Sequence, residues 1–126
     1  ELASGELVAS PPAKLNGTAD SDEGFYGFET KYLDNVVTAT IPAGYDEDLN
    51  QQLAELAIQT FKALDCRGLA RVDFFVTEDG PMLNEVNTMP GFTSISMFPQ
   101  VFQAAGMSYS ELLNTLISSA LERSRK

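Results

Sequence analysis

The sequence predicts an α+β domain in which a mostly antiparallel sheet packs against helices, and three observations support this fold class. Strand-forming runs on both sides of a turn-forming cluster at residues 78–81 are typical of a β-hairpin. Apolar residues recur at helical spacing over residues 46–64 and again after Ser108. A chain of 126 residues, 44% of them hydrophobic, is also long and apolar enough to form one domain with a buried core.

Composition excludes several classes of function. Eight basic against eighteen acidic side chains give a net charge of −10, so we expect no binding to nucleic acid or to an anionic membrane, which attract clustered Lys and Arg. No apolar run approaches the ~20 residues that cross a bilayer, and no leader is recognisable, so we expect a soluble chain. The chain has no His and one cysteine, Cys66. Catalysis would therefore use carboxylates, Arg, Lys, Tyr, Ser or a hard metal ion.

The first half of the chain predicts a long loop, a strand and a helix, in that order. Residues 16–34 mix Gly, Asp, Ser and aromatic side chains without periodicity, which favours a functional loop over the alternative of a disordered linker. Residues 36–42 are β-branched and end in proline, as a strand does. Asp46 can cap a helix that extends to about Leu64. We expect the apolar stripe of this helix to be core: Leu49, Leu53, Leu56, Ala57, Thr60, Phe61 and Leu64.

The end of the chain predicts two further helices. A short helix around residues 99–105 can end at Gly106. Ser108 and Glu111 have the spacing of a capping box, in which each side chain bonds the other's backbone N–H, and they predict the start of a terminal helix. We expect the buried side of that helix to consist of Leu112, Leu113, Leu116, Ile117, Ala120 and Leu121.

The hairpin carries the residues of greatest chemical interest. With an odd-numbered loop centred on Asp79, Asp73 faces Glu85 across the strands, Arg71 faces Asn87, and Phe75 faces Leu83. A shift of one residue would break this pairing. Because strand side chains alternate between faces, the opposite face should be core, with Asn84 as its one polar member. The apolar residues of that face are Val72, Phe74, Val76, Met82 and Val86.

Two carboxylates that face each other across a hairpin repel, and a cation between them would relieve the repulsion. Asp73, Glu85 and Asn87 offer only oxygen donors, which suit Mg²⁺ or Mn²⁺ rather than zinc. Protein-bound Mg²⁺ commonly completes its shell with substrate phosphates, so a nucleotide is the implied partner. Arg71, on the same face, could hold a phosphoryl oxygen. The alternative is a solvated polar face with an Arg–carboxylate pair.

The loop after the hairpin, residues 88–97, adds groups that can bind a small polar substrate. Gly91 allows the backbone to approach a ligand closely, and Thr93, Ser94 and Ser96 add hydroxyls near the proposed metal. A carboxylate or an amine could be held there. The alternative is an ordinary loop whose Ser and Thr side chains make local turns.

Two motifs on this hairpin resemble the C-terminal signature of D-alanine-D-alanine ligases, a family of the ATP-grasp superfamily. They are Arg71-Val72-Asp73-Phe74-Phe75 and Leu83-Asn84-Glu85-Val86-Asn87-Thr88-Met89-Pro90-Gly91-Phe92-Thr93. Residues 24–33 resemble the ω-loop of that family, and residues 106–109 resemble the start of its last helix. The resemblance covers nearly the whole chain. It implies that residues 1–126 are the C-terminal part of an ATP-grasp domain, and that the N-terminal and central domains of the ligase precede them.

The resemblance implies a role for each matching residue. Asp73, Glu85 and Asn87 would bind two Mg²⁺ ions, with Glu85 shared, and Arg71 would contact the transferred phosphate and the tetrahedral intermediate. The backbone of Gly91, the hydroxyl of Ser96 and the amide of Met97 would lie near the carboxylate of the second substrate. Lys31 would contact the γ-phosphate of ATP. Tyr26 and Tyr32 would seal the closed site, and Tyr32 would also help to position the attacking amine. Phe75 and Leu83 would contact adenine.

The implied reaction joins two D-alanine molecules in a cytoplasmic, homodimeric enzyme of peptidoglycan precursor synthesis. ATP phosphorylates the carboxylate of the first D-alanine, and the amine of the second attacks the acyl phosphate. Ligases that accept D-lactate or D-serine, and other ATP-grasp carboxylate-amine ligases, are alternatives. Tyr32 bears on this choice, because relatives that use D-lactate tend to carry His or Phe at the matching position. A module that binds nucleotide without catalysis is the alternative from another class.

Overall fold

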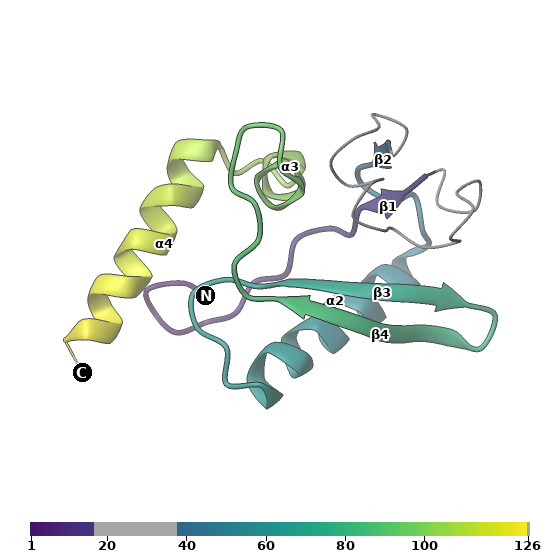
Figure 1. Ribbon diagram of the computed structural model, residues 1–126, viewed down its shortest axis with the longest axis horizontal. Helices are drawn as coiled ribbons and strands as arrows, with labels where there is room; N and C mark the ends of the chain where they lie inside the picture. Colours follow the sequence, from purple (N-terminus) through teal and green to yellow (C-terminus); the bar gives the residue numbers. More distant parts are fainter. Residues whose placement is uncertain (17–37, 126) are drawn as a thin grey trace.

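The computed structural model describes residues 1–16 and 38–125, and within them it contains two antiparallel strand pairs and three helices. Strand β1 (Lys14–Leu15) pairs with β2 (Ala39–Thr40), and β3 (Arg71–Thr77) pairs with β4 (Gly80–Asn87) (Figure 1). The helices are α2 (Glu47–Ala63), α3 (Met97–Ala104) and α4 (Tyr109–Ser124). The predicted α+β class is confirmed, although the described strands form two separate pairs rather than one sheet.

The strand predicted at residues 36–42 is present only in part. Its described strand residues are Ala39 and Thr40, and they pair with β1, not with the hairpin. The side chain of Asn16 donates to Thr40 Oγ1 at 2.9 Å, and its backbone N–H donates to the Thr38 carbonyl at 2.8 Å. These bonds join Asn16 to the strand β2 and to the residue that precedes it.

The β3–β4 hairpin differs from the predicted one at its turn. Thr77 faces Gly80, so the turn has two residues, Glu78 and Asp79, instead of an odd number centred on Asp79. Gly80 has a φ of 112°, a conformation that L side chains rarely adopt. A β-bulge between Asp73 and Phe74 then restores the predicted register toward the other end of the hairpin.

Helix α2 follows the prediction closely. The side chain of Asp46 accepts a hydrogen bond from the Leu49 amide at 2.9 Å and caps the helix. Leu53 and Phe61 are buried and form the centre of the predicted stripe. The prediction of Leu64 as core is wrong, because Leu64 caps the C-terminal end of the helix and is 59% exposed.

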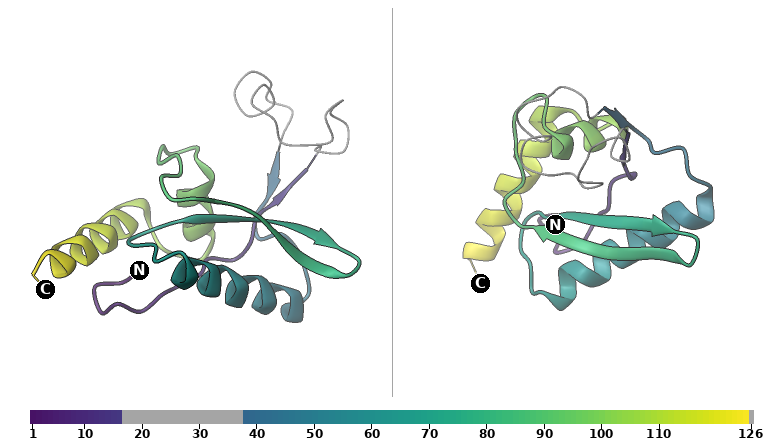
Figure 2. Two further views of the ribbon diagram at one scale, coloured as in Figure 1. Left: turned by 60° about the horizontal axis from the view of Figure 1, so that its bottom comes forward. Right: turned by 45° about the vertical axis from the view of Figure 1, so that its right-hand side comes forward.

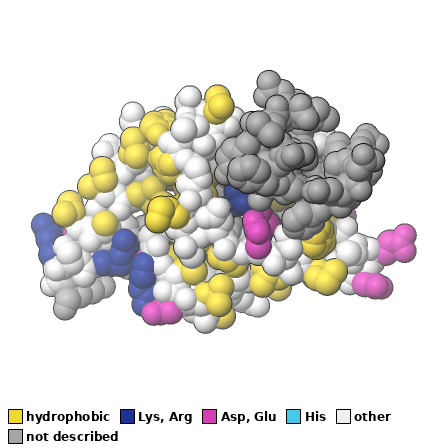
Figure 3. Space-filling model, in the orientation of Figure 1, with side chains coloured by type: hydrophobic (Ala, Val, Ile, Leu, Met, Phe, Trp, Pro, Cys, Tyr) yellow, Lys and Arg dark blue, Asp and Glu magenta, His cyan; other side chains and the backbone are white. Residues whose placement is uncertain are grey.

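Helices α3 and α4 are both confirmed, as is the capping box. The Ser108 hydroxyl accepts from the Glu111 amide, and the Glu111 carboxylate accepts from the Ser108 amide at 2.8 Å. Hydrogen bonding of the carboxylate by the side chain and the backbone N–H of Ser108 lowers the pKa of Glu111. The predicted buried side of α4 is only partly correct. Leu112 is buried, but Leu113, Ile117, Ala120 and Leu121 are exposed, and hydrophobic side chains are visible along α4 in Figure 3.

The two faces of the hairpin meet different helices. Helix α2 runs along one face, and α3 lies on the other side near the end of the hairpin where β3 begins and β4 ends (Figures 1 and 2). We call this the open end of the hairpin, and the end at Glu78 and Asp79 the turn end. None of the helices in the described part of the chain is long and apolar enough to cross a membrane.

Candidate active site

Three charged side chains meet at the open end of the hairpin. Arg71 donates two parallel hydrogen bonds to Asp73, from Nε to Oδ1 and from Nη2 to Oδ2, both at 2.9 Å. The same Nη2 donates to Glu85 Oε1 at 3.3 Å. The two carboxylates therefore converge on one nitrogen, and Arg71 supplies the positive charge that relieves their repulsion.

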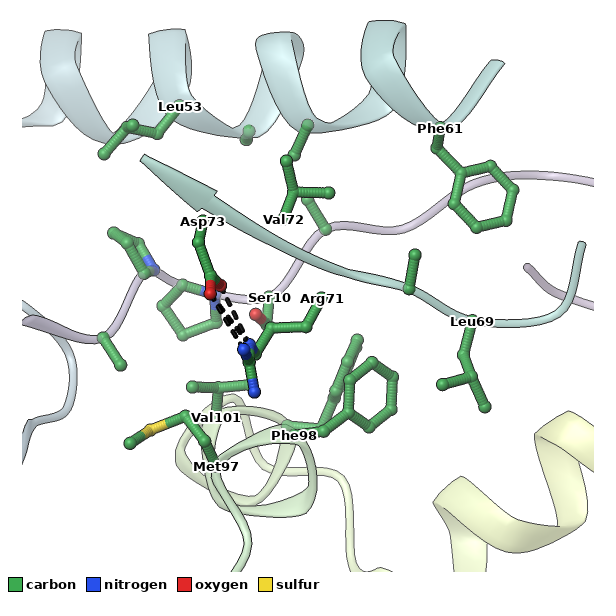
Figure 4. A pocket seen from close by; sticks show the side chains of 18 of the residues that line it. Ser10, Leu53, Phe61, Leu69, Arg71, Val72, Asp73, Met97, Phe98 and Val101 are labelled. Carbon is green, nitrogen blue, oxygen red and sulfur yellow. Dashed lines mark hydrogen bonds and ion pairs between the residues drawn. The ribbon is translucent and has the colours of Figure 1, made fainter. Parts of the chain in front are cut away.

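The predicted cross-strand pairs at this end are correct. Asp73 faces Glu85, and Arg71 faces Asn87. Figure 4 shows why the charged residues share one environment: Val72 points from β3 toward α2 and Leu53, whereas Arg71 and Asp73 point the other way, toward α3. The alternation of side chains along β3 thus places the polar group opposite the apolar face that packs on α2.

The donor set fits a hard divalent cation. Two carboxylates and one amide oxygen are ligands that Mg²⁺ and Mn²⁺ prefer, and Asn87 lies two residues after Glu85 on the same strand. Asn87 Oδ1 accepts a hydrogen bond from the Met89 amide at 2.9 Å, which fixes the amide group and leaves one oxygen lone pair for a ligand. The described residues contain no group of three or more His, Cys, Asp or Glu suited to a metal. A site here would therefore depend on Asn87 and on substrate oxygens.

The turn end corrects one predicted pair. Beyond the bulge Phe75 faces Met82, and Leu83 faces Phe74. Residues directly opposite share a face, so Leu83 lies on the face of Phe74 and Val72, whereas Met82 lies with Phe75 on the face of Asp73. The assignment of Phe75 and Leu83 to one face is wrong for this reason. The predicted contact of both residues with adenine stays a prediction, and Met82 becomes the neighbour of Phe75.

The loop after β4 is held in shape by local hydrogen bonds. The amide of Thr93 donates to Ser96 Oγ at 3.0 Å, and the amide of Ser96 donates to the Thr93 carbonyl at 3.0 Å. Gly91 lies close to the same hydroxyl, because a Cβ added there would be 3.0 Å from Ser96 Oγ. The structure therefore brings Gly91 and Ser96 together, and Met97 follows as the first residue of α3.

A contact from α4 supports this loop, and the sequence reasoning missed it. The hydroxyl of Tyr109 donates to the Phe92 carbonyl at 2.9 Å. The rings of Phe92 and Tyr109 lie 5.5 Å apart, and those of Phe92 and Phe98 lie 5.8 Å apart. Because this cluster joins the loop, α3 and α4, it fixes the loop relative to two helices. The signal in the sequence was the position of Tyr109 directly after the capping serine. A side chain in the first turn of a helix lies near the residues that precede the helix.

A cavity of about 590 Å³ lies between these elements and is lined mainly by apolar groups. Arg71, Asp73 and Glu85 lie on its wall, together with Met97 from α3. Figure 4 shows Arg71 and Asp73 on the side that faces Met97, Phe98 and Val101. The charged group thus forms a polar part of the wall of an otherwise mainly apolar cavity.

Three predicted site residues lie outside the described residues. They are Tyr26, Lys31 and Tyr32, all within residues 17–37. Their predicted roles at the γ-phosphate and in sealing the site stay predictions.

Comparison with known proteins identifies the family. The family model described as D-ala D-ala ligase C-terminus matches residues 5–118. The chain belongs to this family. Two curated D-alanine–D-alanine ligases are similar over almost the whole chain. That of Corynebacterium efficiens is 62% identical over 120 residues, which are 95% of this chain and 33% of the relative. That of Nocardia farcinica is 52% identical over 123 residues, which are 98% of this chain and 34% of the relative. The chain therefore spans about a third of the length of these ligases.

Solved structures give the same family and the ATP-grasp fold. The D-Ala:D-Ser ligase VanG from Enterococcus faecalis aligns with a TM-score of 0.73 at 35% identity, over 94% of this chain and 34% of that one. A D-alanine–D-alanine ligase from Bacillus anthracis, solved in complex with ATP, aligns with a TM-score of 0.58 at 35% identity, over 64% of this chain and 29% of that one.

Proposed function

We propose that this chain is the C-terminal part of the ATP-grasp domain of an ATP-dependent D-alanine–D-alanine ligase. The observation that carries the proposal is the convergence of Asp73 and Glu85 on Arg71 at the open end of a hairpin, next to the loop of Gly91 and Ser96. The 62% identity to a curated ligase supports the reaction class. The remaining domains of the ligase would be supplied by other parts of the full-length protein.

The side chains suit the first step of the proposed reaction, the transfer of the γ-phosphoryl group of ATP to the carboxylate of D-alanine. This step spreads negative charge over phosphoryl oxygens. The planar fork of Arg71 already binds one carboxylate through two nitrogens, and the same geometry matches two phosphoryl oxygens. Mg²⁺ held by Asp73, Glu85 and Asn87 would neutralise phosphate charge when bound. Lys31 would add a second cation at the γ-phosphate.

The second step is the attack of an amine on the acyl phosphate, with release of phosphate. The second D-alanine carries a carboxylate that must be held while its amine reacts. Gly91 and Ser96 lie side by side, Met97 begins α3, and their N–H and O–H groups would bind that carboxylate. Tyr26 and Tyr32 would help to exclude water, which would otherwise hydrolyse the acyl phosphate. Tyr32 would also help to position the amine.

The direct test uses the full-length protein with ATP, MgCl₂ and D-alanine. We expect ADP release that depends on D-alanine, together with D-alanyl-D-alanine detected by mass spectrometry. ATP binding without any dipeptide would favour the alternative of a non-catalytic nucleotide-binding module. The isolated 126-residue chain should bind Mg²⁺·ATP weakly by calorimetry and form no dipeptide, because a nucleotide held between two lobes loses many contacts when one lobe is absent.

A D-serine acceptor is the second candidate, and the alignment with VanG over 94% of this chain is the observation that favours it. Competition between D-alanine, D-serine and D-lactate in one reaction, with product ratios measured from pH 6 to 9, would separate the alternatives. We expect D-alanyl-D-alanine to dominate above neutral pH. A dominant D-alanyl-D-serine product would assign the chain to the second candidate. The predicted homodimer and cytoplasmic location stay predictions.

A further inference from the structure

Ser96 stands at the N-cap of α3, yet its hydroxyl does not cap the helix. An N-cap serine usually accepts a hydrogen bond from the second or third amide of its helix. In α3 the third residue is Pro99, which has no N–H, and the Ser96 side chain makes no capping hydrogen bond. The hydroxyl instead turns back toward Thr93, so its bonds are determined by the loop rather than by the helix.

Thr93 makes two contacts with this hydroxyl. Its amide donates to Ser96 Oγ at 3.0 Å, and its own Oγ1 lies 2.8 Å from Ser96 Oγ, where either atom could donate. A serine hydroxyl has two lone pairs and a single hydrogen. If Thr93 Oγ1 donates, both lone pairs of Ser96 Oγ are occupied by Thr93. The one hydrogen of Ser96 is then directed away from Thr93 and is available for an acceptor group.

We propose that Thr93 is a positioning residue that fixes the Ser96 hydroxyl as a hydrogen-bond donor to the carboxylate of the second amino acid. The inference rests on the proposed ligase function, and it assigns the direction of the Thr93–Ser96 bond. A donor that is already oriented loses less rotational freedom when the carboxylate binds. Thr93 itself does not touch the substrate in this account and acts through Ser96.

Two neighbours of the hydroxyl hold the loop in place around it. Gly91 packs against Ser96 Oγ so closely that a Cβ at residue 91 would lie 3.0 Å away, and the Gly91 backbone is itself expected to face the second substrate. Tyr109 holds the Phe92 carbonyl at 2.9 Å, which anchors the loop between Gly91 and Thr93 to α4. The loop therefore places the Ser96 hydroxyl directly beside the Gly91 backbone.

The test is a double-mutant cycle in the full-length protein, with dipeptide formation measured against D-alanine and ATP. Thr93→Val keeps the shape of the side chain and its backbone N–H but removes the hydroxyl. We expect the KM for the second D-alanine to rise about three- to tenfold, the range of one net hydrogen bond, with kcat and the KM for ATP within about twofold of wild type. Thr93→Ser retains the hydroxyl and should restore the KM.

The second arm of the cycle separates positioning from a merely structural role. In a Ser96→Ala background, Thr93→Val should have no further effect on the KM for D-alanine, because the group through which Thr93 acts is gone. An equal effect of Thr93→Val in both backgrounds, or a wild-type KM in Thr93→Val, would overturn the inference while the ligase function stands. Failure of the wild-type protein to form any dipeptide would instead overturn the proposed function together with the inference.

Discussion

The two ends of the β3–β4 hairpin have different registers and different side chains. At the open end, Arg71, Asp73 and Glu85 form an ion-paired group whose side chains are 27%, 32% and 45% exposed. At the turn end, apolar side chains are exposed, with Met82 at 55% and Leu83 at 48%. The bulge opposite Phe74 separates the two registers. One extra residue in β4 thus allows the same pair of strands to direct charges into the cavity at one end and to follow an independent turn geometry at the other.

The largest expected effect comes from removing both carboxylates of the open end. Asp73→Asn and Glu85→Gln in one variant keep the side-chain shapes and the register of the hairpin but remove the two negative charges. We expect dipeptide formation by the full-length protein to fall by at least ~10³-fold, since more than one electrostatic contact would be lost and each is worth about 10²–10³-fold.

Asn84→Ala is the matched control for this double substitution, because it changes the neighbouring residue of β4 and leaves both charges in place. Its kcat should stay within a few-fold of wild type. A double variant that keeps wild-type activity would contradict a role of the two charges in the reaction.

A smaller effect is expected when one charge is neutralised and the register is kept. Glu85→Gln should lower kcat by at least ~10²-fold, the scale of a lost transition-state electrostatic contact. Glu78→Gln makes the same chemical change at the turn end and should leave kcat unchanged. Steady-state assays of both variants compare the two ends directly, and equal losses would contradict a functional difference between them.

Stability should respond less than activity to Glu85→Gln. Relief of the Asp73–Glu85 repulsion favours the fold, whereas loss of the 3.3 Å pair with Arg71 opposes it. Because such partly exposed pairs contribute about 0–1 kcal/mol, urea unfolding should give a free energy of unfolding within about 1 kcal/mol of wild type. A much larger loss would favour a structural ion pair as the main role of Glu85.

The smallest effect on activity is expected at the turn. Gly80→Ala places a side chain at a φ of 112°, where no neighbouring atom within 4 Å obstructs it, so the cost is backbone strain alone. We expect a loss of about 1–3 kcal/mol in the free energy of unfolding and a kcat within about twofold of wild type. A large loss of kcat would mean that the turn end shares in catalysis.

The open end could be predicted from the sequence, but by an argument that was only partly correct. The pairs Asp73–Glu85 and Arg71–Asn87 followed from an odd-numbered loop, whereas the structure has a two-residue turn and a compensating bulge. The available signal was Asn84, the one polar residue expected on a core face. A polar residue at such a position indicates either a bulge or an incorrectly assigned register. Counting residues outward from the turn cannot distinguish these two cases.

Helix boundaries were predictable and burial was less so. The caps at Asp46 and Ser108 are local hydrogen bonds between neighbouring residues, so they could be identified from spacing. Exposure depends on which other elements cover a helix, and spacing does not reveal this. Hence Leu53 is buried as predicted, whereas Ile117 is 56% exposed on an equally regular apolar stripe. The Thr93–Ser96 pair was likewise hidden, because a serine before a helix normally predicts a cap.

The central claim is that the open end of the hairpin, and not the turn end, holds the metal ion that accompanies the nucleotide. The most direct measurement is Mn²⁺ binding to the full-length protein in the presence of ADP, followed by electron paramagnetic resonance. The account predicts nucleotide-dependent Mn²⁺ binding in the wild type and in Glu78→Gln, and at least ~10-fold weaker binding in Glu85→Gln, since even residues that only support metal ligands contribute 10–100-fold. Equal Mn²⁺ affinity in Glu85→Gln and the wild type would contradict it.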